Sequence, residues 1–241
     1  MRILLVAFLF YVVFLLLLSS SMHTPLNHDE HQFVASGMLF AKGDIMPFID
    51  YPYFHMPYLV FMYGFIFKYF SCLLLSARMI SVVSSLLILL SIFILTLQIF
   101  NKYSYFFRIL IAAGFLSILL NNPIFIYTTN LSWNHALPTW LILIAFVLYC
   151  SGSYHISPKR YMLFSGIFVG LATGIRLSFA IIPAPFIAMI FLFPKVNTLK
   201  DKMKLMFLFC LGFFLALLPA MVKPINVLPA SPKNTFFLLR L

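Results

Sequence analysis

The chain has 241 residues, of which 63% are apolar and 9% are charged, whereas soluble globular domains are about 45–50% apolar and about 25% charged. This composition, with a mean hydropathy of +1.07 and apolar runs along the whole length, excludes a soluble fold. Runs such as 15–18 and 86–90 do not alternate between apolar and polar residues, which excludes an outer-membrane barrel. The sequence therefore predicts an all-α, polytopic membrane helical bundle.

The net charge of +11 does not indicate a nucleic-acid partner. Its 16 Lys and Arg residues are scattered singly between apolar runs and form no basic stripe. Three cysteines, Cys72, Cys150 and Cys210, are too few and too far apart for a disulfide framework. We interpret the basic residues as determinants of membrane topology.

The first apolar run, Ile3–Leu18, has the length of a signal peptide, but residues 19–23 offer no small-residue cleavage site and more spans follow. We therefore expect a retained first span. Apolar content predicts six further spans, for about seven in all: Leu73–Phe100, Ile109–Tyr127, Leu137–Cys150, Tyr161–Ile175, Leu177–Phe193 and Leu205–Val222.

The segment Pro57–Phe70 is apolar and aromatic but has only fourteen residues, with Lys68 among them, which is short for a span. If it lies in the interface, the later basic loops fall on the same side as Arg2, as the positive-inside rule requires. If the segment crosses the membrane, those basic loops lie outside, against the positive-inside rule. We favour a re-entrant or interfacial helix, in a multi-pass protein of the bacterial inner membrane with residues 19–56 outside.

That outer segment holds four of the five carboxylates, namely Asp29, Glu30, Asp44 and Asp50. Polar chemistry is therefore expected on the extracytoplasmic side. A helix is predicted from Asn27 to Gly43, because Asn27 can cap it, Glu30 stands at the capping-box position and glycine suits the C-terminal end. Helix capping alone could explain both Asp29 and Glu30.

The order and spacing of several segments resemble the first outer loop of GT-C fold glycosyltransferases, such as the protein O-mannosyltransferases and the aminoarabinose transferases of lipid A. In that family an Asp-Glu pair opens a surface helix, an aspartate follows a Gly-x-x-Pro turn, and Ala-Arg opens the second span. The matching segments here are Asn27–Phe33, Gly37–Gly43, Pro47–Tyr51, His55–Leu59 and Ala77–Arg78, with Gly170–Ser178 similar to the family's fifth span.

The resemblance implies transfer of a sugar, with inversion, from a polyprenyl-phosphate donor to an extracytoplasmic lipid, glycan or protein acceptor. Phosphate is a good leaving group, so one carboxylate base is enough. The family's catalytic aspartate matches Asp29, and Glu30 is the next candidate. We expect a transmembrane module over residues 1–222 with an outer catalytic loop at 19–72, and an outer tail at 223–241 where relatives continue further.

The remaining site candidates each keep two interpretations. Arg78 and Arg176, near the outer ends of spans, could hold the phosphate or extend to lipid headgroups. Asp50 could orient an acceptor or fold its own turn. His55, with Glu30 or His135, could hold a divalent metal, as in some relatives, or belong to polar loops.

Two other function classes remain open. One is a non-catalytic fragment or partner subunit of such an enzyme. The other is a transporter of lipid-linked intermediates, which is expected to bury ionisable groups at mid-membrane, where these spans have almost none.

Overall fold

The computed structural model describes residues 2–43, 45–154, 158–192 and 198–221; Asp44 and the predicted tail 223–241 lie outside these ranges. The described chain is helical. Its elements are α1 (Arg2–His23), α2 (His28–Gly43), α3 (Tyr58–Phe67), α4 (Leu73–Ile99), α5 (Tyr105–Leu120), α6 (Pro123–Asn130), α7 (Ala136–Tyr154), α8 (Lys159–Ile175), η1 (Leu177–Ile181), α9 (Pro183–Phe191) and α10 (Leu199–Met221).

Within the described residues, three helices, α1, α4 and α10, are long and apolar enough to cross a membrane. The pair α5 and α6, bent by 69° at a short break, makes a fourth if it is counted as one span. The helices α7 and α9 are apolar but shorter. The expected all-helical membrane fold is confirmed, with three or four helical segments of the described chain long enough to span a membrane.

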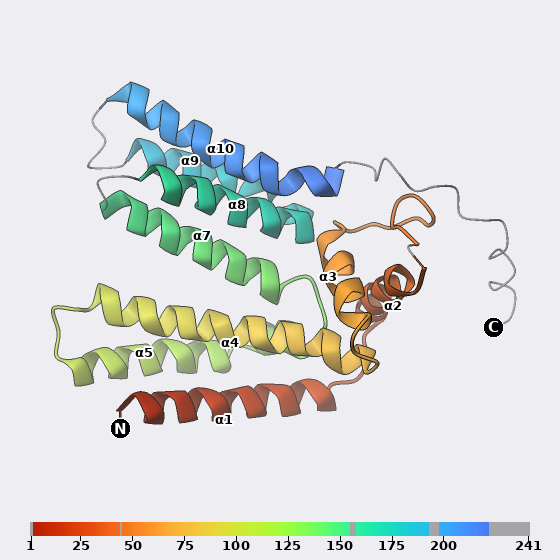
Figure 1. The fold of residues 1–241 in the computed structure, drawn as a ribbon. Coiled ribbons are helices and arrows are strands. Elements are labelled where there is room, and N and C mark those ends of the chain that lie inside the picture. The colour runs from red at the N-terminus through yellow and green to blue at the C-terminus, as the bar shows by residue number, and fades with distance from the viewer. Residues whose placement is uncertain (1, 44, 155–157, 193–197, 222–241) are drawn as a thin grey trace, which may run out of the picture.

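The long helices lie side by side, and α2 and α3 lie across one end of the bundle (Figure 1). This is the end at which α1 finishes and α4 begins. With ten residues, α3 is about 15 Å long, so it does not run the length of the bundle. This placement is the one expected for a segment that does not cross the membrane.

Among the described residues, three apolar cores hold the bundle together. One joins α1 and α4 to α5 and α6 around the buried Leu17, Val82 and Leu89. The second joins α7, α8, α9 and α10 around Phe209. The third lies at the end covered by α2 and α3 and is centred on Phe33. This third core fixes the loops that carry polar residues against the ends of the long helices.

Glycines bring α8 and α10 into direct backbone contact. A Cβ atom at Gly166 would lie 2.0 Å from the Phe209 carbonyl oxygen, and one at Gly170 would lie 2.4 Å from the Phe213 carbonyl oxygen. This is the close approach that small residues four apart allow between membrane helices. The contact was not predicted from the sequence, although the spacing of the two glycines is visible there.

A further glycine places α3 against the end of α8. A Cβ atom at Gly174 would lie 2.2 Å from the ring of Tyr58, so only glycine leaves room for that ring. Tyr58 also donates a hydrogen bond to the Ala216 carbonyl of α10. These contacts hold the start of α3 close to Arg176, the residue that follows α8.

The surface between the two ends of the bundle is apolar. Large exposed side chains cover it, for example Leu4, Phe8, Phe106, Ile118, Ile124 and Phe207. An apolar surface of this extent is stable in lipid and would associate in water. The protein is therefore a membrane protein in its outer surface as well as in its composition.

Candidate functional site

The polar residues of the site begin at the N-terminus of α2. The side chain of Asn27 accepts a hydrogen bond from the Asp29 backbone N–H at 2.9 Å, and its carbonyl accepts one from His31 at 3.2 Å. Asn27 is therefore the N-cap, as predicted. The predicted capping box is wrong, because the Glu30 carboxylate turns to other partners.

Glu30 forms a buried, two-pronged ion pair with Arg78 of α4. Arg78 Nε donates to Oε1 at 2.8 Å and Nη2 to Oε2 at 2.7 Å, and the two side chains are 1% and 0% exposed. The other donors of Arg78 reach the carbonyls of Ser21, Thr24 and Pro25. All five N–H groups of the guanidinium are thus occupied.

The Glu30 carboxylate is also bound by the loop before α7. Oε1 accepts hydrogen bonds from the Ser132 backbone N–H at 2.8 Å and from the Ser132 hydroxyl at 2.7 Å. Burial raises the pKa of Glu30, but the hydrogen bonds from Arg78 and Ser132 outweigh it, so the pKa lies below its ordinary value. The carboxylate stays ionised and joins α1, α2, α4 and this loop.

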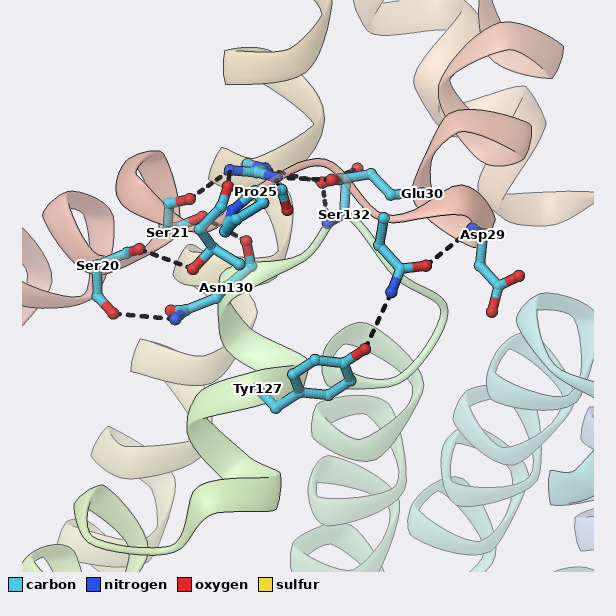
Figure 2. A network of polar contacts seen from close by, with 11 residues as sticks. Ser20, Ser21, Pro25, Asp29, Glu30, Tyr127, Asn130 and Ser132 are labelled. Atoms are coloured by element: carbon cyan, nitrogen blue, oxygen red, sulfur yellow. Dashed lines mark hydrogen bonds and ion pairs between the residues drawn. The ribbon is translucent and has the colours of Figure 1, made fainter.

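Figure 2 shows how differently the two neighbouring acids lie: the Glu30 side chain reaches toward Ser132, while the Asp29 carboxylate points away from the network. Asp29 is exposed, and within the described chain its carboxylate accepts no hydrogen bond. Its helix end is fixed from the other side, because Asn27 Nδ2 donates to the Tyr127 hydroxyl of α6 at 3.0 Å. Asp29 is therefore a free carboxylate on a rigid support.

Arg176 and His135 meet on the same side as Asp29. Arg176 lies in extended backbone between α8 and η1, and its Nη1 donates to His135 Nε2. The same nitrogen lies 3.5 Å from Asn134 Oδ1, and Nε donates to the Ser178 hydroxyl at 3.0 Å. Unlike Arg78, Arg176 remains partly exposed.

The pKa values of His55 and His135 both depend on the charges of Asp29 and Arg176. Burial and the Arg176 charge together lower the pKa of His135 to about 4, against Asp29, which raises it. Burial also lowers the pKa of His55. The Asp29 charge raises this pKa, and the Arg176 charge lowers it. The structure thus brings Asp29, His55, His135 and Arg176 into one electrostatic neighbourhood, which we call the outer polar cluster.

Aromatic rings hold the two histidines in place. His55 packs on the buried Phe33 of α2, with ring centroids 4.8 Å apart. His135 packs on Trp133 at 4.5 Å, and Trp133 meets Tyr127 edge to face at 5.6 Å. A continuous path of contacts therefore leads from the cap of α2 through Tyr127 and Trp133 to His135 and Arg176.

The residues considered for a divalent metal do not fit one. Glu30 has both carboxylate oxygens engaged by Arg78 and Ser132, and His135 Nε2 is engaged by Arg176. Across the ranges that the structure describes, no three His, Cys, Asp or Glu side chains gather as metal ligands do.

Asp50 does not share the outer polar cluster's contacts. Its Oδ2 accepts a hydrogen bond from the Met46 backbone N–H at 2.7 Å, and its own N–H donates to the Met46 carbonyl at 3.0 Å. Phe48, between them, has a positive φ of 68°, which is unusual for a bulky residue. Folding this turn is the role that the geometry supports for Asp50.

Among the described residues, two cavities lie beside α4 and the start of α7. One, of about 510 Å³, is almost wholly apolar and lies between α3, α4 and α7, with Trp140 in its wall. The other, of about 330 Å³, lies where α5 breaks into α6 and reaches α4 and the start of α7, with His135 in its wall. The first suits a hydrocarbon chain and the second a ligand with polar groups.

Comparisons of the chain with protein-family models, with characterised proteins and with solved structures give no match.

Two long-range contacts of the site were not predicted from the sequence. Ser132, which binds Glu30, and Tyr127, which supports Asn27, are more than ninety positions away from their partners. Tyr127 was assigned to the end of a span. The polar stretch 128–135, which interrupts an otherwise apolar region, indicates an outer loop that faces the site, but it does not indicate that Ser132 pairs with Glu30.

Proposed function

We propose that the protein is a GT-C type glycosyltransferase that moves a sugar, with inversion, from a polyprenyl-phosphate donor to an extracytoplasmic acceptor. The observation that carries the proposal is the outer polar cluster: an exposed carboxylate, Asp29, and a partly exposed guanidinium, Arg176, both act electrostatically on His55 and His135. A base and a phosphate-binding cation are the two groups that this reaction requires.

In the proposed reaction, Asp29 accepts the proton of the acceptor hydroxyl as its oxygen attacks the anomeric carbon from the face opposite the phosphate. The bond from that carbon to the phosphate oxygen breaks, and the phosphate leaves with its bonding electrons. Arg176 stabilises the departing phosphate with its planar pair of donors. No second carboxylate is needed, because a phosphate leaves without protonation by a general acid.

Glu30 and Arg78 take no part in this chemistry. Every hydrogen-bond donor of Arg78 is occupied, and both residues are buried. We propose that they hold the loops which position Asp29 and His135. The apolar cavity between α3, α4 and α7 offers space for the first prenyl units of the donor.

The proposal includes seven spans: α1, α4, α5 with α6, α7, α8, η1 with α9, and α10. The nineteen residues of α7 extend about 28 Å and the seventeen of α8 about 25 Å, close to the membrane core of about 30 Å. Seven spans put Arg2 and Lys159 on one side and Asp29 on the other, in accord with the positive-inside rule.

Binding of the shared product tests the phosphate part of the proposal. Undecaprenyl phosphate remains after transfer of any sugar, so its affinity for the protein in nanodiscs needs no knowledge of the sugar. We expect Arg176→Ala to weaken binding by about 1.5–3 kcal/mol, the value of a hydrogen bond to a charged group, and Arg176→Lys to weaken it less. Undecaprenol, which lacks the phosphate, should bind all three proteins equally. Equal affinity of the three proteins for the phosphate contradicts the proposed role of Arg176.

A further inference from the structure

The hydrogen bond between Arg176 and His135 fixes which ring nitrogen of His135 carries the proton. A guanidinium has only donors, so His135 Nε2 must be the acceptor. The tautomer is assigned from this partner. The ring is neutral, in agreement with its lowered pKa, and a neutral ring with an acceptor at Nε2 carries its proton on Nδ1.

The Nδ1–H group of His135 is buried, and within the described chain it has no hydrogen-bond partner. A buried donor without an acceptor costs about 1–3 kcal/mol, so native structures rarely keep one. Nδ1 and Nε2 lie on different sides of the imidazole ring, so Nδ1–H is directed away from Arg176. An acceptor for it has to come from outside the described chain.

His135 is part of the wall of the 330 Å³ cavity at the α5–α6 break. The other polar side chains of that wall are Ser85, Asn122, Thr128 and Thr139, and no acidic, Lys or Arg side chain lines it. Their groups are hydroxyls and one amide, and the remaining wall is apolar. Such a wall is suited to an uncharged molecule that carries both oxygens and hydrocarbon.

The backbone around the cavity also indicates a ligand. The α5–α6 span is bent by 69°, and non-helical backbone at membrane depth is tolerated where it lines a cavity. On the outer side of this break, Ile118 and Ile124 are 68% and 73% exposed, as residues that face lipid are. A molecule in the bilayer therefore reaches the cavity laterally, whereas a protein acceptor would have to thread a side chain between helices.

We propose that the cavity at the α5–α6 break binds the uncharged, hydroxyl-bearing end of a lipid-like acceptor, with His135 Nδ1–H donating a hydrogen bond to one of its oxygens. The assignment as acceptor rests on the proposed function; the binding site rests on the geometry alone. His135 then connects the bound molecule to Arg176, so the acceptor lies beside the group that binds the donor phosphate.

The direct test is the ¹⁵N resonance of His135 Nδ1 in histidine-labelled protein in phosphatidylcholine nanodiscs. The resonance is assigned by its loss in His135→Gln, or by replacing the other histidines one at a time if that variant does not fold. Two uncharged probes, dioctanoylglycerol and octyl β-D-glucoside, distinguish a glycerol hydroxyl from a sugar hydroxyl. Dioctanoyl phosphatidic acid is the charged comparison.

We expect at least one uncharged probe to shift the Nδ1 resonance to the position of a hydrogen-bonded N–H, and the charged probe to leave it unchanged. Thr139→Phe places a larger side chain in the cavity and should lower the affinity for that probe about tenfold, the equivalent of one lost hydrogen bond. Leu211→Phe enlarges an exposed residue of α10 that lines neither cavity and should leave the affinity unchanged.

An unchanged Nδ1 resonance with both uncharged probes overturns the proposal, as does equal weakening by the two Phe variants. The experiment separates this inference from the proposed function, because it requires no sugar transfer. If the probe binds but sugar transfer does not depend on Asp29, the ligand-binding role of the cavity is supported and the proposed catalytic mechanism is wrong. If transfer depends on Asp29 but no probe binds, the catalytic mechanism is supported and the proposed ligand site is wrong.

Discussion

Replacing Arg78 by methionine should destabilise the protein more than any other single polar substitution at this end of the bundle. The change keeps an unbranched apolar stem but removes every donor of the guanidinium. Glu30, 0% exposed, then keeps only the two hydrogen bonds from Ser132. The carbonyls of Ser21, Thr24 and Pro25 lose the same partner.

Breaking a buried pair by removing one partner costs about 3–5 kcal/mol, because the other charge is left buried and uncompensated. Arg78→Lys should cost less, since the charge remains, but the ammonium group has three donors in place of five and cannot match the carboxylate with two parallel bonds. Arg78→Met combined with Glu30→Gln should recover part of the loss, because no uncompensated charge remains.

The measurement is reversible unfolding in mixed micelles by added denaturing detergent, followed by circular dichroism, for the four proteins of this double-mutant cycle. A coupling energy between the two positions above about 1 kcal/mol supports a buried pair. If Arg78→Met unfolds within about 0.5 kcal/mol of the unchanged protein, as most surface substitutions do, then the pair is exposed and the reasoning fails.

Three further outcomes follow from the fold. Gly170→Ala should lower the free energy of unfolding by about 1–3 kcal/mol through overpacking, because the added Cβ would lie 2.4 Å from the Phe213 carbonyl oxygen. Gly114→Ala, whose added Cβ would have no atom within 4 Å, should be neutral or stabilising. Equal effects of the two substitutions on thermal stability contradict the α8–α10 contact. The pKa of His135 falls from 6.5 to about 4 on folding, so the unfolded chain binds a proton at a higher pH than the folded protein does. The contribution of His135 to the free energy of unfolding is therefore complete above about pH 6.5 and is lost as the pH falls toward 4. In the same pH titration, the stability of His135→Gln should decline less than that of the unchanged protein, and an equal decline contradicts the burial of a neutral His135. In intact cells, the exposed Cys72 should react with a membrane-impermeant maleimide, while Lys200→Cys should react only after permeabilisation; the opposite pattern reverses the topology.

Two features of the site could be predicted from the sequence: the helix cap, from the residues next to it, and the side of the membrane on which the polar residues lie. The cap at Asn27 follows from residue type and position, and the topology argument placed Asp29, His55, His135 and Arg176 on one face. The structure brings these four together because α2, the loops before α3 and α7, and the end of α8 all meet at one end of the bundle (Figure 1).

Pairings between distant positions could not be predicted in the same way. Arg78 and Glu30 are separated by 48 residues, and capping explained Glu30 equally well from the sequence alone. The relevant clue was that an arginine inside an apolar span needs a partner. The break between α5 and α6 was also missed, although Asn122 and Pro123 form a typical helix start within the predicted span Ile109–Tyr127.

The role of Asp29 in sugar transfer is the central claim, and single-turnover transfer tests it most directly. Purified protein in nanodiscs is supplied with a panel of undecaprenyl-phosphate sugars, and the free undecaprenyl phosphate and the glycosylated acceptor in a lipid extract are measured together. Asp29→Asn should abolish both products while leaving the helix cap and the amount of folded protein unchanged. Asn27→Ala, the matched control, should lose about 1 kcal/mol of stability and still transfer sugar. Full transfer by Asp29→Asn with a donor that the unchanged protein uses contradicts the account.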